Sequence, residues 1–186
     1  MAALGRDGNV LGALSLVDAD QMSDAVAAAA DQSLTAAAAL SALEHFADGC
    51  SVDRLRRVLG LTSSGTVRLV DRLVAAGDVR RREGPDGRTT SIELTAAGRR
   101  AARRVTAARG GVLEDALGDL SPAERAELER LAARVLENVV RRKLAREAGE
   151  STRWICRLCD MHACERAEGR CPAATAAAAV VAAARS

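Results

Sequence analysis

The sequence predicts a mainly helical protein with one small β-hairpin and long helices on either side of it. Apolar residues make up 48% of the 186 residues, but aromatic residues make up only 1%. A core of this kind consists of Ala, Leu and Val, which favours close-packed helices over packed sheets. The length suits one domain with a small appendage. That appendage is the cysteine-rich segment WICRLCDMHACERAEGRCP at 154–172.

Helix signals follow one another along the first sixty residues. A first helix is expected over 9–30. Ser33 is a suitable N-cap for a second helix over 34–47, because its hydroxyl can accept a bond from a backbone N–H that has no partner inside the helix. Ser51 caps an expected short third helix, which Gly60 ends.

The next stretch, LTSSGTVRLVDRLVAAGDV, predicts a helix with two different faces. The expected buried stripe consists of Val67, Val70, Leu73 and Val74. Polar and charged residues line up on the opposite face at spacings of three and four, namely Ser64, Arg68, Asp71 and Arg72. A short helix, a tight turn at Gly60 and a second helix with a basic outer face form a helix-turn-helix.

A β-hairpin is expected directly after this helix. Residues 79–83 form one expected strand, and 91–94 alternate polar and apolar as a second strand should. The residues between them, Gly84-Pro85-Asp86-Gly87, are strong turn formers. Arginines lie on the arms, and Arg88 lies at the tip. A helix-turn-helix followed by a basic hairpin is a winged helix.

Two long helices should follow the hairpin. Thr95 opens a helical stretch that ends near Gly118, with an expected interruption at Gly110–Gly111. SPAE at 121–124 combines a capping Ser, a Pro at the first helical position and a Glu at the third. The helix that it starts reaches about Arg146 and has one apolar side, formed by Leu128, Leu131, Val135 and Val139.

The chain is thus divided into four regions. They are an N-terminal helical region at 1–32, a winged helix-turn-helix at 33–98, C-terminal helices at 99–148, and the cysteine segment with an Ala-rich tail at 149–186. The tail is expected to be a frayed helix.

Charge is concentrated in the middle of the chain. The stretch 53–104 contains 13 Arg and 6 Asp or Glu, a net charge of +7, whereas the whole chain carries only +2. A basic segment in a near-neutral chain is typical of a polyanion-binding face, and a solvated helix face is the alternative. No convincing catalytic set is found, so no enzyme is predicted, and His45 is interpreted as a packed side chain.

The sequence also predicts where the protein works. It has no run of about 18 apolar residues and no signal-peptide pattern, so no membrane span is expected and a cytoplasmic location is predicted. Thiols stay reduced in that compartment. Clustered cysteines there indicate metal ligands or redox chemistry before structural disulfides.

The stretch SSGTVRLVDRLVAAGDVRRREGPDGRTTSIELTAAGRR resembles the recognition helix and wing of the multiple-antibiotic-resistance regulator (MarR) family. The resemblance lies in VDRL and AAG in the helix, VRRR entering the wing, D-x-R at its tip (Asp86, Arg88) and L-T-x-x-G at its exit (Leu94, Thr95, Gly98). In order of elements it covers about residues 9–147.

The resemblance implies a homodimer that binds a pseudo-palindromic double-stranded DNA operator as a transcriptional regulator, with repression as the expected role. The implied major-groove contacts are Ser63, Ser64, Thr66, Arg68 and Arg72. Arg88 would reach the minor groove with Asp86 as its brace, which agrees with the affinity of a narrow minor groove for Arg. Many relatives bind small aromatic effectors, but aromatic side chains for stacking are almost absent here.

The cysteines are spaced C-x2-C-x4-C-x6-C and are followed by Pro172. Cys156, Cys159, Cys164 and Cys171 can surround one metal centre, and this compact run resembles an iron–sulfur ligand loop. Zinc is the alternative, held by all four cysteines or by three of them with His162, and a dithiol switch without metal is a third interpretation. Placement after a dimerisation helix resembles the iron–sulfur segment of the mercury-resistance-regulator family.

Together these features predict a homodimeric DNA-binding regulator whose four-cysteine centre senses redox, nitric oxide or metal status. The alternative is the same regulator with a structural zinc loop and a small-molecule effector.

Overall fold

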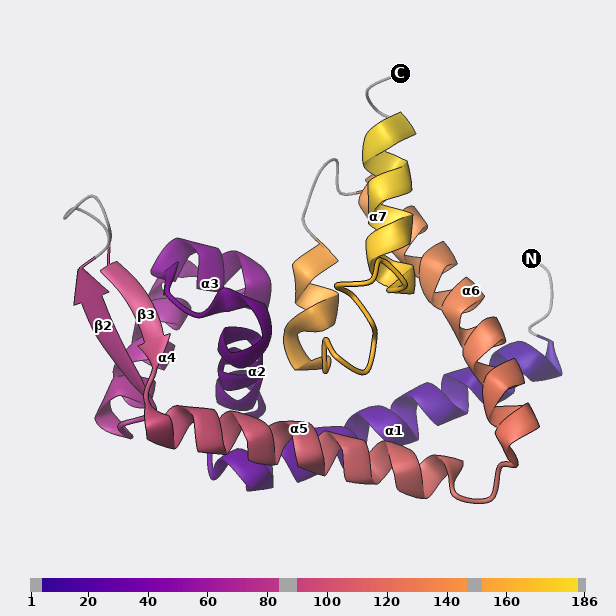
Figure 1. Ribbon diagram of the computed structural model, residues 1–186, viewed down its shortest axis with the longest axis horizontal. Helices are drawn as coiled ribbons and strands as arrows, with labels where there is room; N and C mark the ends of the chain where they lie inside the picture. The colour runs from indigo at the N-terminus through magenta and orange to yellow at the C-terminus, as the bar shows by residue number, and fades with distance from the viewer. Residues whose placement is uncertain (1–4, 84–89, 147–151, 184–186) are drawn as a thin grey trace.

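The computed structural model describes residues 5–83, 90–146 and 152–183. Two long helices, α1 (Arg6–Ala30) and α5 (Ala96–Leu117), lie side by side and form a bar (Figure 1). The winged-helix lobe lies at one end of this bar, a second helix pair lies toward the other end, and the segment η2 lies between them. Along the described chain the elements are α1 Arg6–Ala30, α2 Leu34–Ala42, the π-helix η1 Leu43–Ala47, β1 Cys50–Ser51, α3 Val52–Leu59, α4 Ser63–Ala75, β2 Val79–Glu83, β3 Thr90–Leu94, α5 Ala96–Leu117, α6 Pro122–Arg146, the 3-10 helix η2 Thr152–Leu158 and α7 Pro172–Ala183. The mainly helical fold class with a winged helix is confirmed.

The helix starts lie where the sequence places them, because caps are local. The side chain of Ser33 accepts a hydrogen bond from the Ala36 N–H at 3.3 Å, and Ser51 accepts one from Arg54 at 3.2 Å. At the start of α6, the Ser121 N–H donates to a Glu124 carboxylate oxygen at 2.8 Å, which completes the expected capping box.

Three elements differ from expectation. The last turn of the second helix is a π-helix, η1, and α5 runs without a break through Gly110–Gly111. A glycine inside a helix costs only about 1 kcal/mol, and the packing of α5 along α1 outweighs that cost. The two-residue strand β1 is absent from the sequence prediction, since it is too short to show a periodicity.

The sheet is antiparallel with the order β1-β3-β2. Cys50 pairs with Ile92, and Val79 pairs with Leu94, so β3 is the central strand. The tip of the wing, with Asp86 and Arg88, lies outside the described residues.

The main core fills the lobe and the adjoining parts of α1 and α5. Its largest fully buried side chains include Leu40, Leu43, Leu55, Leu73 and Ile92. On α4 the predicted stripe is partly wrong: Leu69, Val70 and Leu73 are buried, whereas Val67 is 46% exposed and Val74 37%. The helix is turned so that Thr66, a residue that apolar periodicity does not count, completes the buried side.

A second core lies between α6 and α7. It consists of Val140, Leu144, Cys171, Ala173 and Ala176. The Ala-rich tail is therefore not frayed, because its small side chains let α7 pack closely on α6. The apolar side of α6 predicted from the sequence remains on the surface, with Leu128 and Leu131 at 39% and 43% exposure.

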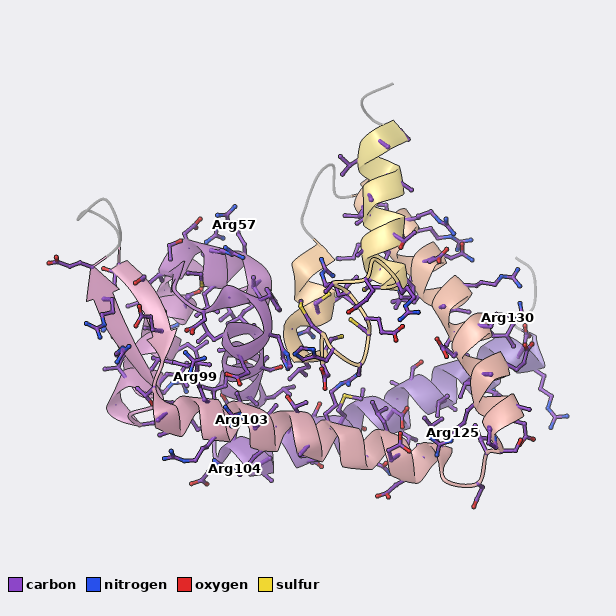
Figure 2. The ribbon with its side chains drawn as sticks, viewed as in Figure 1. Arg57, Arg99, Arg103, Arg104, Arg125 and Arg130 are labelled. Atoms are coloured by element: carbon purple, nitrogen blue, oxygen red, sulfur yellow. The ribbon has the colours of Figure 1, made fainter. Side chains whose placement is uncertain are left out.

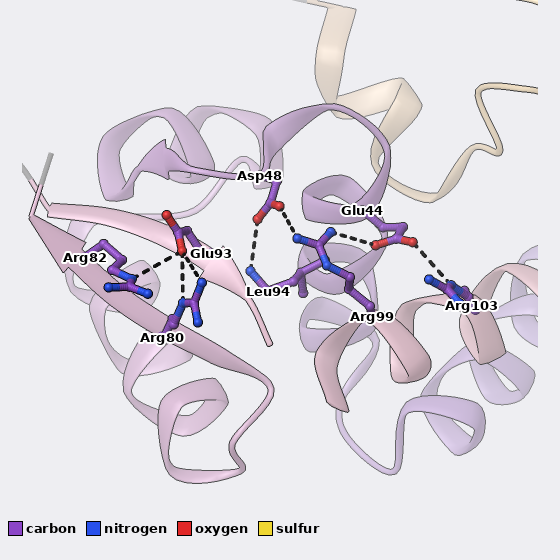
Figure 3. A network of polar contacts seen from close by, with 8 residues as sticks. All are labelled: Glu44, Asp48, Arg80, Arg82, Glu93, Leu94, Arg99 and Arg103. Atoms are coloured by element: carbon purple, nitrogen blue, oxygen red, sulfur yellow. Dashed lines mark hydrogen bonds and ion pairs between the residues drawn. The ribbon is translucent and has the colours of Figure 1, made fainter. Parts of the chain in front are cut away.

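A polar network fixes the base of the wing to α5 (Figure 3). One carboxylate oxygen of Asp48 accepts a hydrogen bond from the Leu94 N–H at 3.0 Å, and the other accepts one from Arg99 at 2.6 Å. Glu44 in turn pairs with Arg99 and Arg103. The end of β3 and the start of α5 are thereby held together with η1.

No single helix among the described residues has the length and apolarity to cross a membrane, although α1 together with Leu34–Ala47, bent by 75° at their junction, has both as a pair.

Candidate DNA-binding face and four-cysteine segment

The outer face of α4 begins at an exposed, well-capped helix N-terminus. The Thr62 hydroxyl accepts a hydrogen bond from the Gly65 N–H at 3.1 Å, so Thr62 is the cap. Ser63 and Ser64 are exposed in the first turn, and Arg68 and Arg72 are exposed in the two turns that follow. Hydroxyls at a helix N-terminus followed by guanidinium groups form a surface suited to phosphates and base edges.

Asp71 is paired with the wing instead of with its own helix. Its carboxylate accepts a hydrogen bond from Arg81 of β2 at 2.6 Å. Within the described part of the chain, neither Arg68 nor Arg72 forms an ion pair. Their guanidinium groups are therefore available to a polyanion.

Thr66 is removed from the set of implied DNA contacts. It is fully buried, and its hydroxyl donates to the Thr62 carbonyl at 2.9 Å. The structure thus corrects the sequence prediction for this residue: Thr66 stabilises the first turn of α4 from inside.

Val67 is a surface residue that the sequence pattern assigns to the core. It lies on the exposed side of α4, one position before Arg68. An exposed apolar side chain on such a face can contact the methyl group of thymine. The exposure of Val67 depends on how α4 is rotated about its axis against α3 and β2. From the sequence alone, a Val in a helical apolar stripe indicates a core residue.

Some arginines of the basic stretch have structural partners. Figure 2 shows Arg99, Arg103 and Arg104 along the part of α5 nearest the lobe. Arg104 donates to the Ala29 carbonyl at 3.0 Å near the end of α1. On the wing, Arg80 and Arg82 both pair with Glu93. The charge of the sequence stretch therefore overstates the charge that faces a partner, and Arg68 and Arg72 of α4 are among the arginines that form no ion pair within the described residues.

The four cysteines come from three different places in the C-terminal segment. Cys156 is part of η2 and Cys159 follows its end, Cys164 lies in a turn, and Cys171 directly precedes α7. Cys156 and Cys171 are buried, at 4% and 5% exposure, whereas the other two are partly exposed. The fifth cysteine, Cys50, is buried in β1, and burial raises the pKa of its thiol.

The guanidinium group of Arg166 lies between the two buried sulfurs. Nη1 of Arg166 is 3.4 Å from the Sγ of Cys156 and 3.9 Å from the Sγ of Cys171. Among the described residues, no three Cys, His, Asp or Glu side chains are arranged to hold a metal ion. The donor set still fits a thiophilic metal by its chemistry, since it offers four thiols, two of which already contact a positive charge. Ligation requires the guanidinium to move out and the sulfurs to draw together.

One thiol of the segment is acidic. A hydrogen bond from Cys156 lowers the pKa of Cys159 to about 6, and Arg109, Arg166 and Arg157 act in the same direction. The same hydrogen bond raises the pKa of Cys156, and burial adds to the rise. The thiolate, the form that ligates metals and reacts with oxidants, is therefore favoured at Cys159.

His162 lies in the turn between Cys159 and Cys164. Together with His45, Met161 and Arg166 it lines a cavity of about 450 Å³ between the segment and η1. Its backbone N–H donates to Asp160 at 2.8 Å, and this bond, with a second from Ala163, holds the turn. Among the described residues His162 belongs to no group arranged to hold a metal.

A second cleft separates the lobe from the C-terminal segment. Its volume is about 410 Å³. Leu34, Ala38, Leu59 and Leu61 form its apolar side, and its cationic residues are Arg57, Lys143 and Arg157.

The fold and the exposed face of α4 define a winged helix-turn-helix protein of the DNA-binding class. A sequence model of the MarR family matches residues 30–89, which contain most of the lobe. No curated protein matches the chain.

Solved structures share the fold over most of the chain. Wild-type MarR from E. coli in its apo form is 22% identical, with a TM-score of 0.60 over 73% of this chain and 99% of that one. A probable transcriptional regulator from Pseudomonas aeruginosa is 27% identical, with a TM-score of 0.51 over 67% and 95%. CouR from Rhodococcus jostii RHA1, bound to p-coumaroyl-CoA, is 19% identical, with a TM-score of 0.53 over 73% and 95%.

The family model covers the winged-helix part of the chain, and the solved structures share its fold. Regulation through DNA binding is the function that this fold supports. The family match ends before the four-cysteine segment.

Proposed function

We propose that the chain is a homodimeric transcriptional regulator, acting as a repressor, that reads a pseudo-palindromic operator with α4. The observation that carries this proposal is the exposed face of α4, where Ser63, Ser64, Val67, Arg68 and Arg72 lie beside an arginine-rich wing. Serines at the N-terminus position the helix on phosphates, the arginines hold guanine edges bidentately, and Val67 contacts thymine methyl groups. Arg88, braced by Asp86, is proposed for the minor groove.

The dimer contact is proposed to form from the apolar surfaces of α1 and α6. Exposed residues on the N-terminal half of α1 include Leu14, Leu16 and Val17, at 49%, 71% and 54%. The apolar side of α6, including Leu131 and Val135 at 43% each, is equally uncovered. Large apolar patches of this kind on a single chain indicate an interface.

We expect Arg68→Ala and Arg72→Ala each to weaken operator binding by about 1–3 kcal/mol, as loss of a base-reading arginine does. Fluorescence anisotropy with a labelled duplex measures the change, and affinity of the unaltered protein should fall steeply as salt rises. Arg130→Ala is the matched control, because Arg130 is an exposed arginine on α6 that pairs with Glu127. Equal losses in all three variants would contradict a role for α4.

The four-cysteine segment is proposed as the sensor of redox, nitric oxide or metal status. Four thiols in one short segment support a thiolate-ligated centre, since two of them contact the same guanidinium and a third, Cys159, is acidic. An iron–sulfur cluster is the cofactor we propose, held by Cys156, Cys159, Cys164 and Cys171, with zinc as the alternative. Bound there, the centre would supply a charge that changes with oxidation, nitrosylation or loss of metal.

Protein purified without oxygen should be brown and absorb in the visible range if the centre contains iron and sulfide. Serine at any of the four positions should remove that absorption, because each sulfur is a ligand. Cys50→Ser should leave it unchanged, since Cys50 lies in β1, away from the segment. Colourless protein with one zinc per chain would favour the structural alternative, and protein with neither metal would leave a dithiol switch.

The cleft beside the segment supports the small-molecule alternative. The cleft is lined by apolar side chains and by three cationic residues, Arg57, Lys143 and Arg157, so it would suit an apolar acid. CouR, a protein of the same fold, binds p-coumaroyl-CoA. In this alternative, operator affinity responds to an aromatic carboxylate and not to removal of the metal. Measuring operator affinity after each of these two treatments therefore distinguishes a small-molecule effector from a metal sensor.

A further inference from the structure

The four-cysteine segment is the described part of the chain that packs on both hydrophobic cores. Leu158 of η2 packs against the main core of the lobe. Ile155 of η2 and Cys164 pack against the second core between α6 and α7. In agreement with this, η2 contacts α2 and α3 on one side and α7 on the other. Figure 1 shows η2 in this position, between the lobe and the α6–α7 pair.

Three hollows adjoin the segment beside these contacts. A cleft of about 410 Å³ lies beside the contacts of η2 with α2 and α3, and a cavity of about 450 Å³ lies between the turn after η2 and η1. A third cavity, of about 710 Å³, lies between α6 and the turn that holds Cys164. The hollows leave part of the segment unpacked, so it should open at lower free-energy cost than the two cores on which it packs.

The residues between the cysteines contain little regular structure to hold the segment together. From 161 to 169 the chain forms turns, with Glu165 and Gly169 in the left-handed region. Its internal links include backbone hydrogen bonds such as that from the Cys164 N–H to the Asp160 carbonyl at 3.2 Å, the contacts of Arg166 with two sulfurs, and an ion pair of Arg170 with Glu165 at 2.6 Å. The sulfurs of Cys156 and Cys171 add a link between the two ends of the segment through Arg166.

The positions of the sulfurs connect the two sides. Cys156 lies on η2, between Ile155 and Leu158, whereas Cys171 is part of the second core. A centre ligated by both would join η2, which touches the lobe, to the start of α7. The guanidinium of Arg166, which contacts both sulfurs, marks the point where such a centre would lie.

We propose that the four-cysteine segment is a releasable brace between the DNA-binding lobe and the α6–α7 pair, which a thiolate-ligated metal locks in place. With the metal bound, Leu158 stays docked on the lobe and fixes the position of α4 relative to α6. When the metal is lost, η2 leaves the lobe and the lobe is free to reorient. This inference rests on the proposed sensor function and adds to it the contact through which the signal reaches α4.

Hydrogen–deuterium exchange of the full-length protein tests the brace without reference to DNA. Samples are compared with the metal bound and after its removal by a chelator, with ferricyanide added when the metal is iron. Removal of the metal should raise the exchange rates of backbone amides in α2 and α3 by about fivefold or more, because η2 no longer covers these helices. Metal content, measured on the same samples, identifies the bound metal as zinc or iron.

Leu158→Ala provides the decisive variant, because it weakens docking on the lobe and keeps all four cysteines. It should retain the metal, show raised exchange in α2 and α3 from the start, and respond less than about twofold to metal removal. Val181→Ala is the control, since Val181 lies on α7 at 49% exposure, away from the lobe. It should respond as the unaltered protein does.

Three outcomes would overturn the brace: protein that binds neither iron nor zinc, α2 and α3 exchange that ignores metal removal, or a Leu158→Ala variant that responds like the unaltered protein. Operator affinity, measured on the same samples, reports separately on the proposed function. A protein whose exchange follows the metal but which binds no duplex would refute DNA regulation and leave the brace intact.

Discussion

Leu131→Asp should convert the protein from a dimer to a monomer. Leu131 lies in the exposed apolar stripe of α6, and a carboxylate there would be buried without a partner if two copies met across it. Loss of the second half-site should lower operator affinity by about 100-fold or more, as loss of bivalency does. Light scattering should give a mass near the 19.4 kDa of one chain instead of twice that value.

The control for this experiment is Ala123→Asp, an exposed position of α6 outside the apolar stripe. It adds the same charge near a helix N-terminus, where a carboxylate is favourable, and should leave the dimer intact. A Leu131→Asp protein that remains dimeric, or a monomer of the unaltered chain that binds operator at full affinity, would exclude α6 as the interface.

Gly98→Ala should lower the free energy of unfolding by about 3 kcal/mol, through overpacking at a site that cannot relax. A Cβ at Gly98 would overlap the Asp78 carbonyl and lie 3.0 Å from Cδ2 of Leu94. The Asp78 carbonyl is held where it is by the Thr95 N–H at 2.9 Å, so the start of α5 would have to move away from the wing.

Gly110→Ala, in the same helix, should have the opposite sign. A Cβ there meets nothing within 4 Å, and Ala is favoured over Gly inside a helix by about 0.5–1 kcal/mol. Urea denaturation of the two variants measures both effects. Equal stability of the two variants would mean that α5 does not pack on Asp78 as described.

The accuracy of the sequence prediction follows the range of the interactions. Ser33, Ser51 and Ser121 are identified correctly as caps because each bonds to a backbone N–H within three residues. The strand β1 could not be predicted because two residues are too few to show an alternating pattern. In addition, its residue Cys50 pairs with Ile92, which is far away in the sequence. The continuity of α5 escapes it because that continuity depends on packing along α1.

The candidate site shows the same division. The helix face with Arg68 and Arg72 can be predicted from spacing, but the burial of Thr66 and the exposure of Val67 depend on how α4 rests on the lobe. The clustering of cysteines is visible in the sequence. The position of Arg166 between them depends on turns, and the docking of Leu158 on the lobe joins residues that no local signal connects.

The central claim is that two copies of α4 read one operator. Selection of bound duplexes from a random-sequence pool tests this directly, because the protein itself then picks out the operator. We predict enrichment of a pseudo-palindrome whose half-site centres lie about one helical turn of DNA apart. Enrichment of no sequence, or of an isolated half-site, would contradict the claim.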